Sequence, residues 1–206
     1  MRTISAASPS ACSVSTMTIA GKLNLLQVCP TQLVVAVEWM EDSSDLTTAR
    51  SSRKPQFNNQ VSVKFGSKSV KMFRNGSVHV TGCKTVQDFV DAITAVCEAM
   101  TLAGIGAVVE VVSFDVVMIN VTFSAAAALG LRDLRDKGLA KGWTASYDAD
   151  VYPGLNLKIP VDEGTATARN VTALIFRSGN IILTGARTPS QVVEAHTRLM
   201  SLVAGQ

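Results

Sequence analysis

Two 23-residue segments of this chain are similar, with identical residues at eight positions, and the second begins 103 residues after the first. Residues 70–92 read VKMFRNGSVHVTGCKTVQDFVDA and residues 173–195 read ALIFRSGNIILTGARTPSQVVEA. The offset is half of the 206 residues, so two similar halves are predicted, each built from one supersecondary unit. The identical pairs are Phe73/Phe176, Arg74/Arg177, Gly76/Gly179, Thr81/Thr184, Gly82/Gly185, Thr85/Thr188, Val90/Val193 and Ala92/Ala195.

Each copy predicts two strands followed by a helix. Ser69–Phe73 and Ser77–Thr81 alternate apolar and polar residues, as half-buried strands do, and Val61–Phe65 adds a strand before them. Asn75-Gly76 predicts a tight hairpin turn with positive φ angles. Thr85 and Thr188 each precede a helical pattern with a polar residue three positions later, which is a capping signature. Each half is therefore expected to be antiparallel sheet with a helix on one face.

The strand alternation assigns side chains to the two faces of the sheet. An apolar face without a helix is either covered by a partner chain or another segment, or is itself a flat binding surface. The residues expected to face the helix are Val70, Met72, Val78, Val80, Ile175, Ile181 and Leu183. Those expected on the other face are Lys71, Phe73, His79, Thr81, Thr172, Leu174, Phe176, Ile182 and Thr184.

Composition and cysteine spacing exclude several classes. With 47% hydrophobic and 17% charged residues, the chain is neither disordered nor a disulfide miniprotein. A net charge of +3 neither proves nor excludes nucleic-acid binding. The cysteines at 12, 29, 83 and 97 form no CxxC motif, so buried free thiols are predicted rather than zinc, and no cofactor is expected. No glycine loop, acid pair or Cys–His pairing indicates an enzyme. Polar interruptions argue against a membrane span at Val116–Leu131.

The repeated segment resembles the hallmark of the TATA-box-binding protein family, the strand pair L-I-F-x-S-G-x-x-x-x-T-G-A followed by Lys or Arg. Leu174–Arg187 matches it nearly in full. Ser146–Leu155, which reads SYDADVYPGL, is similar to the family's S-Y-E-P-E-L-F-P-G-L. Ile119–Thr122 is similar to its Q-N-I-V strand, and Val14–Ile19 with Leu23–Leu25 resembles its opening strand. The resemblance extends over about residues 12–203.

This resemblance implies an α+β fold: a twofold-repeated saddle with a curved antiparallel sheet and helices on the convex face. Residues 1–11 would be an N-terminal tail, 12–103 the first repeat and 104–206 the second. The implied function is that of a general transcription initiation factor in the nucleus. It would bind the A·T-rich minor groove of double-stranded DNA, bend it with aromatic wedges, and recruit a transcription factor IIB-like protein and RNA polymerase. The divergence from the family pattern suggests that the protein comes from a large DNA virus or a protist. A viral protein would act in the host nucleus or a viral factory.

The resemblance also assigns roles to individual residues. The aromatic wedges would be Phe57, Phe73, Tyr152 and Phe176. The groove-floor residues would be Val14, Thr81, Asn120, Thr122, Thr172, Leu174, Ile182 and Thr184, with Lys71 and His79 as polar additions. The phosphate-binding residues would be Lys84, Lys158 and Arg187, while Arg74 and Arg177 either add phosphate contacts or are ordinary solvated side chains.

Some positions depart from the family pattern. Cys12 stands where the first-repeat Asn is expected, so only Asn120 of that symmetric pair would remain. Lys71 and His79 occupy positions that are apolar in the family. The first repeat therefore either tolerates G·C pairs or binds DNA largely by charge, unless both side chains fold away. The alternative function is the same scaffold used as a protein-interaction or structural module without sequence-specific DNA binding.

Overall fold

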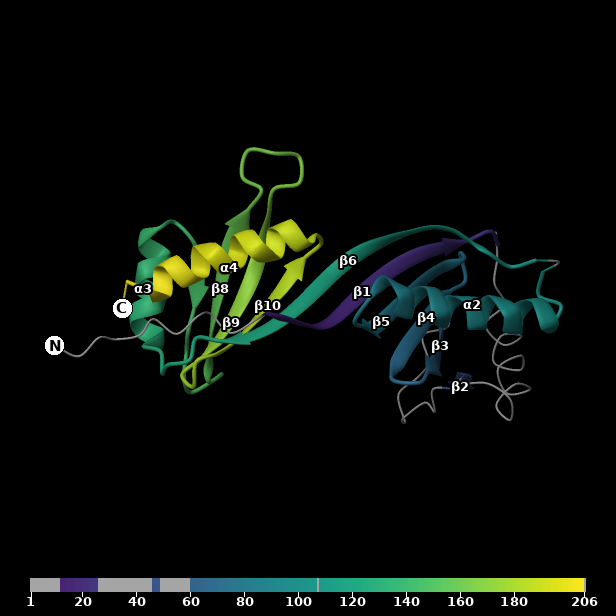
Figure 1. The fold of residues 1–206 in the computed structure, drawn as a ribbon, viewed down its shortest axis with the longest axis horizontal. Coiled ribbons are helices and arrows are strands. Elements are labelled where there is room, and N and C mark those ends of the chain that lie inside the picture. The colour runs from purple at the N-terminus through teal and green to yellow at the C-terminus, as the bar shows by residue number, and fades with distance from the viewer. Residues whose placement is uncertain (1–11, 26–45, 49–59, 107, 206) are drawn as a thin grey trace. The chain divides into compact units, whose positions relative to one another are not determined.

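Two units, each of antiparallel sheet and helix, make up the described chain (Figure 1). The structure is a computed structural model that describes residues 12–25, 46–48, 60–106 and 108–205. We call residues 16–117 the N-terminal unit, and residues 12–15 with 118–205 the C-terminal unit. The first and sixth strands each have residues in both units. The repeat boundary placed after residue 103 stays a prediction.

The N-terminal unit has its strands in the order β2-β3-β4-β5-β1, with antiparallel neighbours. Helix α2 packs against β4 and β5, as Figure 1 shows. The first part of β6 also belongs to this unit. The bounds are β1 Ser13–Leu23, β2 Leu46–Thr48, β3 Gln60–Phe65, β4 Lys68–Phe73, β5 Ser77–Cys83, α2 Val86–Leu102 and β6 Val111–Ser124.

The C-terminal unit repeats this arrangement in the order β6-β10-β9-β8-β7, again antiparallel. Helix α4 crosses β8, β9 and β10 on one face, and α3 packs against β7, β8 and α4 (Figure 1). The sequence patterns did not predict α3. The bounds are α3 Leu131–Ala140, β7 Thr144–Ser146, β8 Gly154–Val161, β9 Arg169–Phe176, β10 Asn180–Ala186 and α4 Pro189–Val203.

The predicted alternation of side chains in the repeated strands is confirmed. Ile175 in β9 is fully buried against the helix layer, while its neighbours Leu174 and Phe176 are half-buried. Val80 in β5 is likewise fully buried, and His79 beside it is half-buried. Both units therefore have one core-facing side of the sheet and one side that no described helix covers. We call the latter the open face of each unit.

The hairpin turns differ in detail from the predicted two-residue turn. The β4–β5 loop has three residues, and only Gly76 among them has a positive φ, of 78°. The Gly76 N–H donates to the Phe73 carbonyl, and the Asn75 side chain accepts from the Ser77 N–H. This is the three-residue hairpin that ends in a left-handed glycine. A Cβ on Gly76 would also lie 2.4 Å from the Leu25 carbonyl oxygen, so the position is closed to other residues.

Both predicted helix starts are confirmed. Thr85 and Asp88 form a complete capping box at α2, and the Thr188 hydroxyl accepts from the Gln191 N–H at α4, where Pro189 is the first residue. The backbone N–H of Lys84 donates to Asp88, and hydrogen bonds of this kind hold the pKa of that carboxyl below its usual range.

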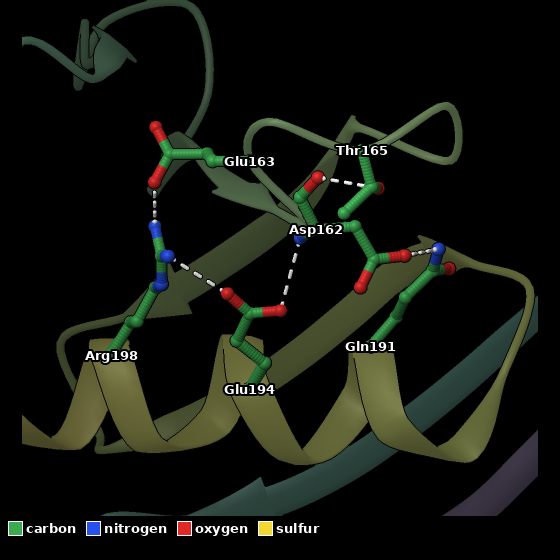
Figure 2. A network of polar contacts seen from close by, with 6 residues as sticks. All are labelled: Asp162, Glu163, Thr165, Gln191, Glu194 and Arg198. Carbon is green, nitrogen blue, oxygen red and sulfur yellow. Dashed lines mark hydrogen bonds and ion pairs between the residues drawn. The ribbon is translucent and has the colours of Figure 1, made fainter.

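A polar network ties the β8–β9 loop to α4, as Figure 2 shows. The Asp162 N–H donates to Glu194 over 3.0 Å, and the Gln191 amide donates to the Asp162 carboxylate over 2.7 Å, which lowers the pKa of Asp162. Arg198 forms ion pairs with Glu163 and Glu194 at 2.6 and 2.8 Å. The charges on this side of α4 are therefore paired within the unit.

The expectation of buried free thiols holds for two of the cysteines. Cys83 and Cys97 are buried and free, whereas Cys12 is exposed, so the prediction was wrong there. Cys29 lies outside the described residues. No helix of the described ranges is long and apolar enough to cross a bilayer.

Candidate nucleic-acid interface

The open face of the C-terminal unit has an apolar centre. Leu174 on β9 pairs with Ile182 on β10, and Ile182 pairs with Thr122 on β6. On the other side Leu174 pairs with Asn156 on β8. The side chains in this row are half-buried, since they alternate along their strands with the core residues. The row presents apolar groups in its middle and a polar group at each end.

A second row on the same face is polar throughout. Thr172 pairs with Lys158 on one side and with Thr184 on the other. The Thr184 hydroxyl donates to the Asn120 side-chain oxygen over 2.6 Å. This hydrogen bond sets the orientation of the Asn120 amide, because it identifies the oxygen as the acceptor of the pair. Thr122, Thr172, Leu174, Ile182, Thr184 and Asn120 thus lie together on the predicted face.

Two aromatic rings stand at the edge of this face. Tyr152 precedes β8, and Phe176 ends β9. Their ring centroids are 6.1 Å apart in an edge-to-face arrangement. Tyr152 is 43% exposed, so it is available to a binding partner. The two residues proposed as wedges of the second repeat therefore lie side by side, and their role as wedges stays a prediction.

The open face of the N-terminal unit is more polar. Lys71 on β4 pairs with His79 on β5, in the position that Leu174 and Ile182 occupy in the other unit. Lys71 is exposed, and the half-buried His79 ring packs edge-to-face on Phe73 with centroids 5.1 Å apart. Both polar side chains therefore lie on the open face. Thr81 shares this face, while Phe57, the other predicted wedge, lies outside the described residues.

The predicted phosphate-binding cations are all exposed. None takes part in an ion pair within the described part of the chain, where the paired cations are Lys68, Arg135, Lys137 and Arg198. Exposed cations without an ion pair are available to an anionic ligand. The exposed residues are Lys84, Lys158 and Arg187 with the turn residues Arg74 and Arg177.

The strand registers correct one prediction about symmetry. Ile19 pairs with Val80 in the N-terminal unit, and Val121 pairs with Leu183 in the C-terminal unit. Val80 and Leu183 are equivalent positions of the repeat, so their partners Ile19 and Val121 are equivalent too. The residues that precede these partners, Thr18 and Asn120, are therefore counterparts. Cys12 and Asn120 are therefore not a symmetric pair. The assignment of Asn120 to the groove floor stays a prediction.

Sequence reasoning missed two polar residues on the open faces. Lys64 pairs with Ser69, just as Lys158 pairs with Thr172, so the two lysines are repeat counterparts. Asn156 lies beside Leu174 at the outer end of the apolar row. The signal was present as matching alternation in SVKF at 62–65 and NLKI at 156–159. The offset there is 94 rather than 103, because the second repeat carries extra residues between these strands.

Val14 is placed near this site at the start of β1. It is 41% exposed, and its neighbours Ser13 and Ser15 hydrogen-bond to Thr122 and to the Asn120 carbonyl. Among the described residues no three His, Cys, Asp or Glu side chains gather where they could hold a metal ion.

Comparisons with known proteins agree on one family. Residues 113–205 match the family model described as transcription factor TFIID, or TATA-binding protein (TBP). The chain is 29% identical over 131 residues to a TATA-box-binding protein of Archaeoglobus fulgidus, and 25% identical over 130 residues to one of Thermoplasma volcanium. Each match covers 62% of this chain and 64% of the relative, so the chain spans less than two thirds of either relative's length.

A solved structure, Methanococcus jannaschii TBP, has a similar fold, with a TM-score of 0.68 at 17% identity. The similarity covers 95% of this chain and 99% of that one. The predicted fold class is confirmed as a twofold-repeated α+β fold of antiparallel sheet with helices on one face. The origin in a virus or a protist stays a prediction.

Proposed function

The chain belongs to the TATA-binding protein family, and from this premise we propose that it is a non-enzymatic transcription initiation factor that binds the DNA minor groove and bends it. The observation that carries this proposal is the open face of the C-terminal unit. There an apolar row of Leu174 and Ile182 lies beside the aromatic pair of Tyr152 and Phe176. Lys158 lies on the same face, is exposed, and forms no ion pair among the described residues.

The chemistry of this face fits an A·T-rich minor groove. At A·T pairs the groove floor presents only acceptors, whereas G·C pairs add a protruding amino group. Leu174 and Ile182 offer a smooth apolar contact, and the hydrogen-bonded pair of Thr184 and Asn120 lies on the same face. Such a face accommodates A·T pairs and collides with the guanine amino group.

Bending would come from the aromatic residues. Insertion of a side chain between base pairs costs a few kcal/mol of lost stacking per step, and the larger contact with bent DNA offsets this cost. Tyr152 and Phe176, whose rings are in contact, would make one such insertion, and Phe73 would make a second. Lys84, Arg187, Arg74 and Arg177 would then bind phosphates.

The proposed partners follow from the family rather than from this chain's geometry. We propose that the DNA-bound protein recruits a transcription factor IIB-like protein and RNA polymerase. Its place of action would be where DNA is transcribed, in a nucleus or a viral factory.

The test measures binding and bending together. Duplexes that are A·T-rich or G·C-rich carry a dye at each end, so that energy transfer reports bending while anisotropy reports affinity across a salt series. Wild type should bind and bend the A·T-rich duplex, and Phe176→Ala should lose bending. Val193→Ala, at a residue on α4 that is 64% exposed, is the matched control and should leave both unchanged. Absence of binding at low salt would overturn the proposal.

The alternative function is a protein-interaction module on the same scaffold. Lys71 and His79 favour it, since they interrupt the apolar row in the N-terminal unit. The two functions differ in the salt series, because binding that neutralises phosphates weakens steeply as salt rises. An interaction module would show no salt-sensitive DNA binding.

A further inference from the structure

A groove of about 650 Å³ lies in the N-terminal unit, between helix α2 and the segment that leads into β6. Phe89, Ile93 and Cys97 line it from the helix, and Val109 and Phe114 line it from the other side. The groove is thus largely apolar and belongs to the helix-bearing layer of the unit. None of the proposed DNA contacts lines it.

Large apolar side chains around this groove are unusually exposed. Leu102, Val108 and Phe114 all line it and are 77%, 59% and 44% exposed. Because these residues line one groove, they form one local patch. Single exposed apolar residues are common in proteins, but a patch that borders a groove is typical of an interaction site.

The charged residues that line the groove are all acidic. Between Thr85 and Leu131 the sequence has five acidic residues and no Lys, Arg or His. Two of the acids, Glu98 and Glu110, line the groove itself. Together with burial they raise the pKa of the Cys97 thiol to about 11, with burial as the main cause. The five residues are Asp88, Asp91, Glu98, Glu110 and Asp115.

Most of these acidic residues form no ion pair among the described residues. Asp88 pairs with Lys68, but Glu98 and Glu110 have no ion pair within the described ranges. The α4 helix differs, because Arg198 there neutralises Glu163 and Glu194 (Figure 2). A groove with unpaired carboxylates repels DNA and attracts a cationic partner.

We propose that this groove docks a protein segment that presents large apolar side chains flanked by lysine or arginine, as a basic amphipathic helix does. Apolar side chains of the segment would enter between α2 and Phe114, and its cations would meet Glu98 and Glu110. This is recognition of a helix in a groove, with anchors at helical spacing. The site is separate from the open faces, so DNA and this partner can bind together.

The test uses the full chain and three labelled peptides. The first is an amphipathic helix of leucine and lysine, the second replaces its lysines with glutamate, and the third scrambles the order of the first. Anisotropy should show binding of the first peptide only, weakening as salt rises. Shifts in ¹⁵N-labelled amide signals should fall on α2 and residues 108–114.

Two variants test the two halves of the recognition. Glu98→Gln with Glu110→Gln should weaken the basic peptide about 10-fold at low salt, which corresponds to about 1.4 kcal/mol. Val108→Asp should weaken it although it adds a negative charge, because Val108 lines the groove and its apolar contact is lost. Val193→Asp on α4 is the control and should have no effect.

Three results would overturn the proposal. Equal binding of all three peptides would mean nonspecific adsorption. No binding of the basic peptide would mean that the groove is closed, for instance by another segment of this chain. If the wild type is a dimer and Val108→Asp makes it a monomer, a second copy of the chain occupies the groove. DNA affinity measured on the same variants reports separately on the proposed DNA function.

Discussion

The rings of Tyr152 and Phe176 pack above the backbone of Gly154, which lies opposite Phe176 in the β8–β9 register. A Cβ on Gly154 would lie 2.7 Å from Tyr152 Cε1 and 3.1 Å from Phe176 Cε1. The absence of a side chain at this position is therefore what lets both rings settle on the strand. Glycine is needed here because the two rings approach the backbone closely, and not because of a positive φ angle.

Gly154→Ala should displace the aromatic pair. Tyr152 is partly exposed and can move, so the free energy of unfolding should fall by no more than about 1 kcal/mol. DNA bending by the end-labelled assay should drop, and affinity should fall about 10-fold if one base-stacking contact is lost. Gly205→Ala is the control, because its Cβ would meet only ordinary contacts. Unchanged bending would show that the ring pair is not a wedge.

Neighbouring residues of β9 should separate stability from binding. Ile175 is fully buried, so Ile175→Ala should lower the free energy of unfolding by about 2–5 kcal/mol. Leu174→Ala lies on the open face and should cost much less stability while weakening DNA binding. Denaturant unfolding and anisotropy on both variants provide the check. Equal loss of stability would mean that the open face is part of the core.

How much of this arrangement the sequence predicts depends on the strength of the local signal. The faces of β4, β5, β9 and β10 could be assigned because half-buried strands alternate strictly, and the caps of α2 and α4 because capping depends on adjacent residues. Helix α3 carries neither signal. Its N-cap is Gly130, which makes no side-chain bond, and Gly138 inside it suggests a break. In the structure Gly138 lets α3 approach Leu157 closely, since a Cβ would lie 2.6 Å from it.

The strand registers could not be predicted from the sequence either. The equivalence of Thr18 and Asn120 rests on backbone pairing, since β1 and β6 have few residues in common. Matching by motif placed Cys12 opposite Asn120 instead. The equivalence of Lys64 and Lys158 was missed for a related reason, because the longer β8–β9 connection changes the offset between the repeats. Pairing geometry carries this information, and short motifs do not.

Lys71 and His79 should weaken base preference in the N-terminal unit. Both replace apolar residues of the equivalent row. A ring nitrogen of His79 can accept from the guanine amino group that an apolar floor would reject, and the Lys71 ammonium can donate to the acceptors of the groove floor. Lys71→Leu with His79→Val should therefore raise the ratio of A·T to G·C affinity. Anisotropy on the two duplexes measures the ratio. No change in the ratio would remove these two residues from the DNA interface.

Lys64 and Lys158 should contribute equally to the salt dependence. Each phosphate contact adds about 0.9 to the slope of log affinity against log salt. Lys64→Ala and Lys158→Ala should each reduce the slope by about that amount, and the double variant by about twice as much. Lys141→Ala, an exposed cation just after α3, is the control and should leave the slope unchanged. A change for Lys158 alone would mean that repeat equivalence does not extend to binding.

His196 should make stability fall in mildly acidic solution. Its ring packs edge-to-face on Phe123 at 4.7 Å, and burial lowers the pKa of the imidazole from 6.5. Because the folded pKa is lower than the unfolded one, the unfolded state binds the proton first, and stability declines as pH falls below about 6.5. His196→Phe keeps the ring contact without a titrating group and should flatten the decline between pH 6.5 and 5. Denaturant midpoints at several pH values provide the measurement, and parallel curves for both proteins would show that another group causes the decline.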